Sequence, residues 1–123
     1  MNAGHNSPIV LRRKHGRCRL LSLTAECAPV GLLEDSRYTS TTFQLRVGDV
    51  LIAYTDGVTE SENSDGRAFG HERLERILGE RRAQDPQQIL QHILDELSVH
   101  SAGCSQADDI TIVVMRVEAQ EGR

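Results

Sequence analysis

One short apolar segment constrains the fold of this chain more than any other feature. Residues 50–54 read Val-Leu-Ile-Ala-Tyr, and Thr55, Asp56 and Gly57 follow them directly. The segment is too short and too β-branched to favour a helix, so it predicts a buried β-strand. This strand delivers a carboxylate to its own end, and the glycine lets the backbone turn or approach another segment closely. Such a strand end is typical of a metal or phosphate site, although a simple Asp-Gly turn explains the same residues.

The composition indicates one small domain. The chain has 123 residues and 38% apolar residues, but only 3% aromatics and no Trp, so its core is built from Leu, Ile and Val. The net charge of −4 argues against nucleic acid as a partner. No apolar run approaches membrane-spanning length, and residues 1–6 lack the layout of a signal peptide, so no membrane association is expected.

The cysteines point to a reduced protein in the cytoplasm. There are three of them, Cys18, Cys27 and Cys104, and no two have CxxC spacing. An odd number without this spacing argues against a zinc site and against a disulfide framework. We therefore expect free thiols and a cytoplasmic location.

Four further segments predict strands. Residues 9–11 and 18–23 flank a turn at residues 14–16 and predict a hairpin. Residues 38–45 alternate between two faces, and the turn at residues 46–49 predicts that they pair antiparallel with residues 50–54. Residues 110–117 predict a second buried strand, which begins after carboxylates instead of ending on one.

Two helices are predicted in the second half of the chain. The first covers residues 70–82, because Leu74, Ile77 and Leu78 fall on one helical face. The second covers residues 86–100, where Asp85 is placed to cap the helix and Pro86 to occupy its first position. Strands and helices in this order predict an α+β fold.

The carboxylates at the two buried strands suggest a common site. Asp56 follows one strand, and Asp108 and Asp109 precede the other, so antiparallel pairing would bring them to one edge of the sheet. Carboxylate oxygens suit Mg²⁺ or Mn²⁺. Two such ions roughly 3.5–4 Å apart would hold a bridging hydroxide and neutralise charge on a phosphoryl group. The alternative is that Asp56 and Asp109 merely cap turns.

Seven short motifs follow one another in a fixed order between Asn2 and about Val117. They are Asn-Ala-Gly-His-Asn-Ser-Pro (2–8), Pro-Val-Gly-Leu (29–32), Val-Gly-Asp (47–49), Tyr-Thr-Asp-Gly-Val-Thr-Glu (54–60), Asp-Gly-Arg with Phe-Gly (65–70), Glu-Arg-Leu (72–74) and Asp-Asp-Ile-Thr (108–111). Each motif alone is weak. The ordered set resembles the SpoIIE/RsbU-type phosphatases, which are bacterial members of the PPM family of metal-dependent Ser/Thr protein phosphatases.

The resemblance implies a fold and a chemistry. The fold is part of a layered α/β/β/α sandwich, with two antiparallel sheets packed together and helices outside. The reaction is hydrolysis of phosphoserine or phosphothreonine by a metal-activated water at a two-metal Mn²⁺ or Mg²⁺ centre. Asp56 and Asp108 resemble the family's catalytic metal ligands, and Asp109 is a third candidate ligand. The implied substrate is a phosphorylated protein such as an anti-sigma-factor antagonist.

The chain also departs from the family pattern. Residues 1–118 resemble only the C-terminal part of the domain, without the N-terminal strands and the acidic motif that bridges the two metals. Residues 119–123 are expected to form a disordered tail. His5 stands where many PPM phosphatases have Asp, which puts a third metal site in doubt. The histidine is then either a general acid or a hydrogen-bonded structural residue.

Three functions compete at this stage. The first is a phosphoprotein phosphatase that uses Asp56 and Asp108. The second is a catalytically incomplete fragment that binds protein or forms a homodimer, because missing strands would leave apolar edges and faces open. The third, a hydrolase with Ser105 or a cysteine as nucleophile, has little support because the chain has no Gly-x-Ser-x-Gly motif and none around Cys104.

Overall fold

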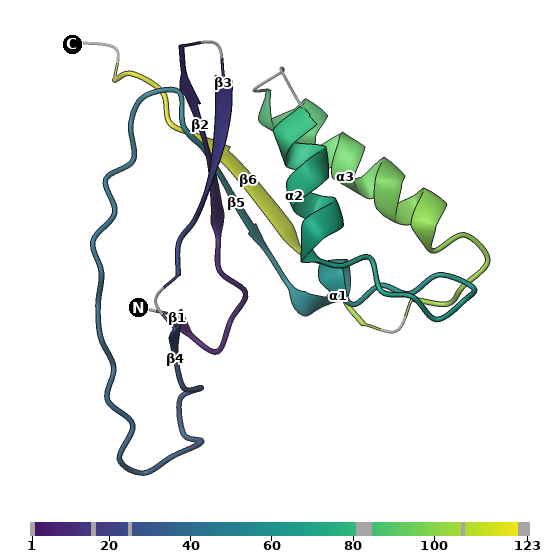
Figure 1. Ribbon diagram of the computed structural model, residues 1–123, viewed down its shortest axis with the longest axis horizontal. Helices are drawn as coiled ribbons and strands as arrows, with labels where there is room; N and C mark the ends of the chain where they lie inside the picture. The colour runs from purple at the N-terminus through teal and green to yellow at the C-terminus, as the bar shows by residue number, and fades with distance from the viewer. Residues whose placement is uncertain (1, 16, 25, 81–84, 107, 121–123) are drawn as a thin grey trace.

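A four-stranded antiparallel sheet carries two helices on one of its faces (Figure 1). The computed structural model describes residues 2–15, 17–24, 26–80, 85–106 and 108–120. Its elements are β1 (Asn2–Ala3), β2 (Ile9–Lys14), β3 (Arg17–Ser22), β4 (Glu26–Cys27), β5 (Val50–Tyr54), α1 (Asp56–Thr59), α2 (His71–Glu80), α3 (Pro86–His100) and β6 (Ile112–Arg116). The sheet order is β3-β2-β5-β6, and β1 pairs with β4 in a separate parallel pair. The predicted α+β class is confirmed.

The core lies between the sheet and the helices α2 and α3. Alternate residues of β2 and β5 face it, and each helix presents a stripe with spacings of three and four residues. The buried set comprises Ile9, Leu11, Val50, Ile52, Tyr54, Val58, Phe69, Leu74, Ile77, Leu78, Ile89, Ile93 and Leu97. The predicted N-cap is confirmed, because the side chain of Asp85 accepts a hydrogen bond of 2.8 Å from the Gln87 amide. Residues 81–84, where the first predicted helix was expected to end, lie outside the described residues.

Two of the predicted strand pairings are confirmed. β2 and β3 form the hairpin, with Ile9 opposite Ser22 and Lys14 opposite Arg17. β5 and β6 are antiparallel neighbours, with Val50 opposite Arg116 and Tyr54 opposite Ile112. The last strand covers residues 112–116, which is shorter than the predicted 110–117.

The predicted strand at residues 38–45 is wrong. These residues form no strand and run as an extended segment outside the sheet (Figure 1). Their proposed partner has no free edge, because β5 already pairs with β2 on one side and with β6 on the other. The alternation of apolar and polar residues therefore marks an extended segment without predicting its partner.

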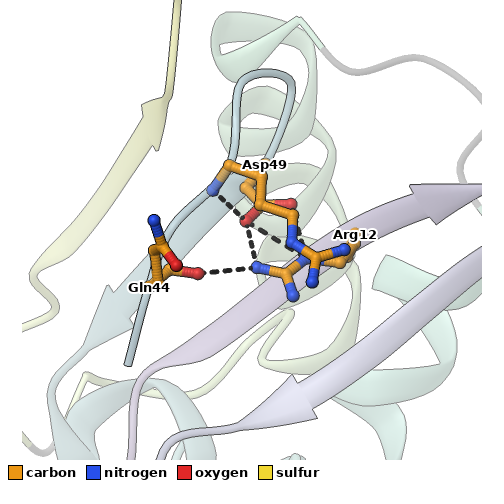
Figure 2. Close-up of polar contacts among 4 residues, drawn as sticks. Arg12, Gln44 and Asp49 are labelled. Atoms are coloured by element: carbon orange, nitrogen blue, oxygen red, sulfur yellow. Dashed lines mark hydrogen bonds and ion pairs between the residues drawn. The ribbon is translucent and has the colours of Figure 1, made fainter. Parts of the chain in front are cut away.

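An ion pair attaches this extended segment to the sheet. Asp49 is 1% exposed, and its carboxylate accepts hydrogen bonds from Arg12 at 2.6 Å and from the Arg46 amide at 2.8 Å. Figure 2 shows the same guanidinium donating to the main-chain carbonyl of Gln44, at 3.0 Å. It also lies 5.1 Å from the centre of the Phe43 ring. Arg12 and Asp49 thus fix the turn that leads into β5.

Both long helices lie on one side of the sheet, and within the part of the chain that the structure describes no helix covers the second face (Figure 1). Ile112 and Val114 of β6 pack against the core, so Val113 and Met115 point to the opposite face, where they are 47% and 50% exposed. They pair with Ala53 and Leu51 of β5. We call these four residues the open sheet face. Within the described ranges, no helix is long and apolar enough to cross a membrane.

Candidate functional site

The ends of β5 and β6 adjoin, and Thr55 links them. Its hydroxyl donates to the main-chain oxygen of Asp109 at 3.1 Å and accepts from the amide of Thr111 at 3.0 Å. The amide of Thr55 also donates to the main-chain oxygen of Thr111 at 3.1 Å. The segments that carry Asp56 and Asp108–Asp109 are therefore adjacent, as the antiparallel prediction required.

Gly57 allows these two segments to approach closely. A Cβ atom at this position would lie 2.3 Å from the main-chain oxygen of Asp109 and 3.4 Å from that of Asp108. Real Cβ contacts essentially never fall below 3.0 Å, so no other residue fits without a backbone shift. The sequence predicted a turn or a close approach at this glycine, and the structure shows a close approach.

The carboxylates themselves are exposed and partly hydrogen-bonded. Asp56 opens α1, and its Oδ1 atom accepts from the side-chain amide of Asn6 at 2.7 Å. Asp108 accepts from the amide of Asp109 at 2.7 Å. The site thus combines three segments: the β1–β2 loop, the β5–α1 junction and the residues before β6.

Asn6 and Thr55 are site residues whose roles the sequence did not reveal. Asn6 belongs to the motif at residues 2–8, and Thr55 directly precedes the aspartate of the Asp-Gly motif. Their place within these two motifs was the available signal. A polar side chain next to a candidate ligand is a natural partner for orienting it.

The β1–β2 loop that carries Asn6 is fixed by local hydrogen bonds. The side chain of Asn2 donates to the main-chain oxygen of His5 at 2.6 Å and accepts from the amide of His5 at 2.9 Å. The Nδ1 atom of His5 lies 3.0 Å from the main-chain oxygen of Asn6, so Nδ1 carries the proton and donates. Both predicted roles of His5, general acid and structural residue, remain open.

The donor set suits a hard divalent cation in part. Asp56 and Asp108 provide carboxylate oxygens, which Mg²⁺ and Mn²⁺ prefer. Among the residues that the structure describes, however, no three side chains of His, Cys, Asp or Glu gather so as to hold a metal ion. The assignment of Asp56, Asp108 and Asp109 as ligands, and of the first two as catalytic residues, stays a prediction.

Comparison with known families identifies the chain's relatives. The family described as Stage II sporulation protein E (SpoIIE) matches residues 1–118. The chain belongs to the SpoIIE family. It is similar to Protein IcfG of Synechocystis sp., with 33% identity over 115 residues that cover 94% of this chain and 18% of that protein.

Solved structures show that this SpoIIE-family chain has part of the PP2C fold. The phosphatase domain of the cell fate determinant SpoIIE from Bacillus subtilis, in a crystal presoaked with Mn, matches with a TM-score of 0.64 and 22% identity. The match covers 98% of this chain and 50% of that one. The SiaA-PP2C domain of Pseudomonas aeruginosa matches with a TM-score of 0.73 and 22% identity, over 94% of this chain and 44% of that one. The chain thus spans about half of a known phosphatase domain.

Proposed function

We propose that this chain supplies the β5–β6 part of a metal-dependent phosphoprotein phosphatase site, which hydrolyses phosphoserine or phosphothreonine. One observation carries the proposal. Asp56 follows β5, Asp108 and Asp109 precede β6, and these two strands are antiparallel neighbours. The hydrogen bonds of Thr55 and the close approach at Gly57 keep the two strand ends in contact. The family match and the likeness to phosphatase domains support it.

Mg²⁺ or Mn²⁺ is the proposed cofactor, held by Asp56 and Asp108 with Asp109 beside them. A bound ion of this kind neutralises phosphoryl charge and acidifies a bound water. The chain's own residues position the ligands. Asn6 donates to Oδ1 of Asp56 and orients that carboxylate, and Thr55 fixes the neighbouring segment. Because the chain spans half of the compared domain, we propose that further ligands come from the rest of a longer protein.

The proposed substrate is a phosphorylated protein of a bacterial signalling pathway, such as an anti-sigma-factor antagonist, in the cytoplasm. This part of the proposal rests on the motif set shared with SpoIIE/RsbU-type phosphatases. In the reaction, water attacks phosphorus, the bond between phosphorus and the serine or threonine oxygen breaks, and that oxygen takes up a proton.

Turnover of p-nitrophenyl phosphate and of a phosphoserine peptide, with and without Mn²⁺, tests the proposal. The assay uses this chain and a longer protein that contains it. We expect Mn²⁺-dependent turnover that Asp56→Asn and Asp108→Asn each lower about 100-fold, while the exposed loop variant Asp35→Asn retains it. Calorimetry should show weaker Mn²⁺ binding by Asp108→Asn. Turnover that needs no metal, or that Asp56→Asn leaves intact, contradicts the proposal.

The open sheet face favours a second candidate function, which is self-association through this face. Val113 and Met115 are about half exposed on a face that no helix covers. Apolar surface of this kind favours burial against a second copy of the chain. Sedimentation velocity should show a dimer for the wild type and a monomer for Met115→Lys. The control Val99→Lys, which changes an exposed residue of α3, should remain a dimer. A monomer at all concentrations refutes this candidate.

A further inference from the structure

A polar cavity of about 370 Å³ opens beside the candidate site. The loop after β1, the end of β5 and the first half of α2 contribute to its walls. The residues that matter here are His5, Asn6, Tyr54, His71 and Glu75. His71 and Glu75 are four residues apart on α2, so they lie on the same side of that helix.

The cavity and the candidate site share Asn6. This residue lines the cavity, and its side-chain amide donates to Oδ1 of Asp56 at 2.7 Å. A group bound in the cavity would therefore lie next to the carboxylate that we assign to phosphate hydrolysis. This adjacency is what a subsite for the residues around a phosphorylated serine requires.

The charge of the cavity favours a cation. Among the described residues that line it, Glu75 is the only carboxylate and none is a Lys or an Arg. Tyr54 places its hydroxyl 3.1 Å from Nδ1 of His71.

The hydrogen-bonding groups suit a ligand that only donates. His5 uses its Nδ1–H to donate to the Asn6 carbonyl, so in the neutral ring Nε2 is left as an acceptor. The carboxylate of Glu75 is a further acceptor in the same lining, and the hydroxyl groups of Ser22 and Thr24 can accept as well as donate. An ammonium or guanidinium group has donors and no acceptor.

We propose that this cavity is a recognition subsite for a lysine or arginine side chain of the phosphoprotein substrate, next to its phosphorylated residue. The inference rests on the proposed function for the identity of the substrate. Glu75 is the specificity-determining residue, because its carboxylate pairs with the cationic group. Tyr54 and His71 line the cavity beside it. A second phosphate or an acidic side chain is disfavoured there, because the carboxylate of Glu75 would repel it.

The cavity can be tested without any turnover, with n-butylammonium as a lysine side-chain analogue. The whole chain is titrated at constant ionic strength, and the imidazole resonances of His5 and His71 are followed by NMR. We expect saturable shifts in the wild type and in Glu72→Gln, a matched change on the same helix outside the cavity. Glu75→Gln should weaken binding about threefold, as for a solvent-exposed ion pair. No saturable shift, or equal binding by Glu75→Gln, overturns the subsite.

Peptide specificity provides the second measurement. The assay compares kcat/KM for two sets of phosphoserine peptides, using the longer, active protein. One set carries lysine and the other norleucine, placed in turn at each of the three positions before and the three positions after the phosphoserine. One position should favour lysine by about threefold in kcat/KM, and Glu75→Gln should remove this preference while Glu72→Gln keeps it. A flat profile overturns the subsite even if turnover is normal. Analogue binding without metal-dependent turnover supports the subsite and instead contradicts the proposed phosphatase function.

Discussion

Replacing Gly57 with alanine tests how tightly the two strand ends are packed. Gly57 lies in α1 with an ordinary helical backbone, so helix propensity alone predicts that Gly57→Ala stabilises the protein by up to about 1 kcal/mol. The contact with Asp109 predicts the opposite. The added Cβ would lie 2.3 Å from the Asp109 carbonyl oxygen, against a practical limit of 3.0 Å, so the segments must separate by roughly 0.7 Å.

The magnitude follows from what has to move. The atom that the Cβ meets belongs to the backbone, and Thr55 holds that same carbonyl oxygen in a hydrogen bond, so it cannot turn aside like a flexible side chain. Overpacking against a fixed backbone atom falls in the upper part of the usual range, at about 2–3 kcal/mol. After subtracting the gain in helix propensity of up to about 1 kcal/mol, a net loss of about 1–2 kcal/mol remains, which lowers the Tm of a domain of this size by about 4–8 °C.

Gly79→Ala is the matched control. Gly79 also lies in a helix, α2, but among the described residues its added Cβ would meet the side chain of Leu20 alone, at an ordinary contact distance of 3.6 Å. Thermal unfolding followed by circular dichroism should therefore show opposite signs, with a lower Tm for Gly57→Ala and an unchanged or slightly higher Tm for Gly79→Ala. An equal or higher Tm for Gly57→Ala would refute the close approach of the two strand ends.

Substitutions at three further positions test the parts of the fold that position the site. Asp49→Ala removes the acceptor of Arg12 and should destabilise the protein by about 1–3 kcal/mol in urea unfolding, and a loss within experimental error would count against the ion pair. The Arg12 hydrogen bond lowers the pKa of Asp49 below its usual value. The wild type should therefore lose this stability as the pH falls through that lowered pKa, whereas Asp49→Asn should show a shallower decline there. Asp85→Ala should cost about 1 kcal/mol because the Gln87 amide loses its cap, while Asp85→Ser should retain most of it. Leu78→Ala, at a fully buried position, should cost about 2–5 kcal/mol, and a smaller loss would indicate a loosely packed core.

The sequence predicted those parts of the fold whose information is local. The helix at residues 86–100 begins with a cap and a proline and carries an apolar stripe, and the structure shows it over the same residues. The hairpin of β2 and β3 was likewise readable, because both strands and the turn are contiguous. Helix α1 was missed because it is one turn long, too short to show a periodic pattern.

Prediction from the sequence failed where the structure of a segment depends on a distant segment that pairs or bonds with it. Residues 38–45 alternate like a strand, but β2 occupies the edge of β5 that they would need. That pairing joins residues about 40 positions apart and leaves no local trace. The same holds for Asn6, whose hydrogen bond to Asp56 spans 50 residues. The adjacency of the two strand ends was nevertheless predicted, because each end carries acidic residues that point to a shared site.

The link between Thr55 and Thr111 also bears on how the protein folds. The two residues are 56 positions apart, and closing a loop of that length costs roughly 3.5 kcal/mol in chain entropy from the (3/2)RT ln n relation. The β2–β3 hairpin and the helices α2 and α3 rely on local contacts and can form before that closure. We therefore expect the β5–β6 junction to be acquired late in folding, so that the candidate site and the final native topology arise in the same step. A mutation at this junction should speed unfolding more than it slows folding.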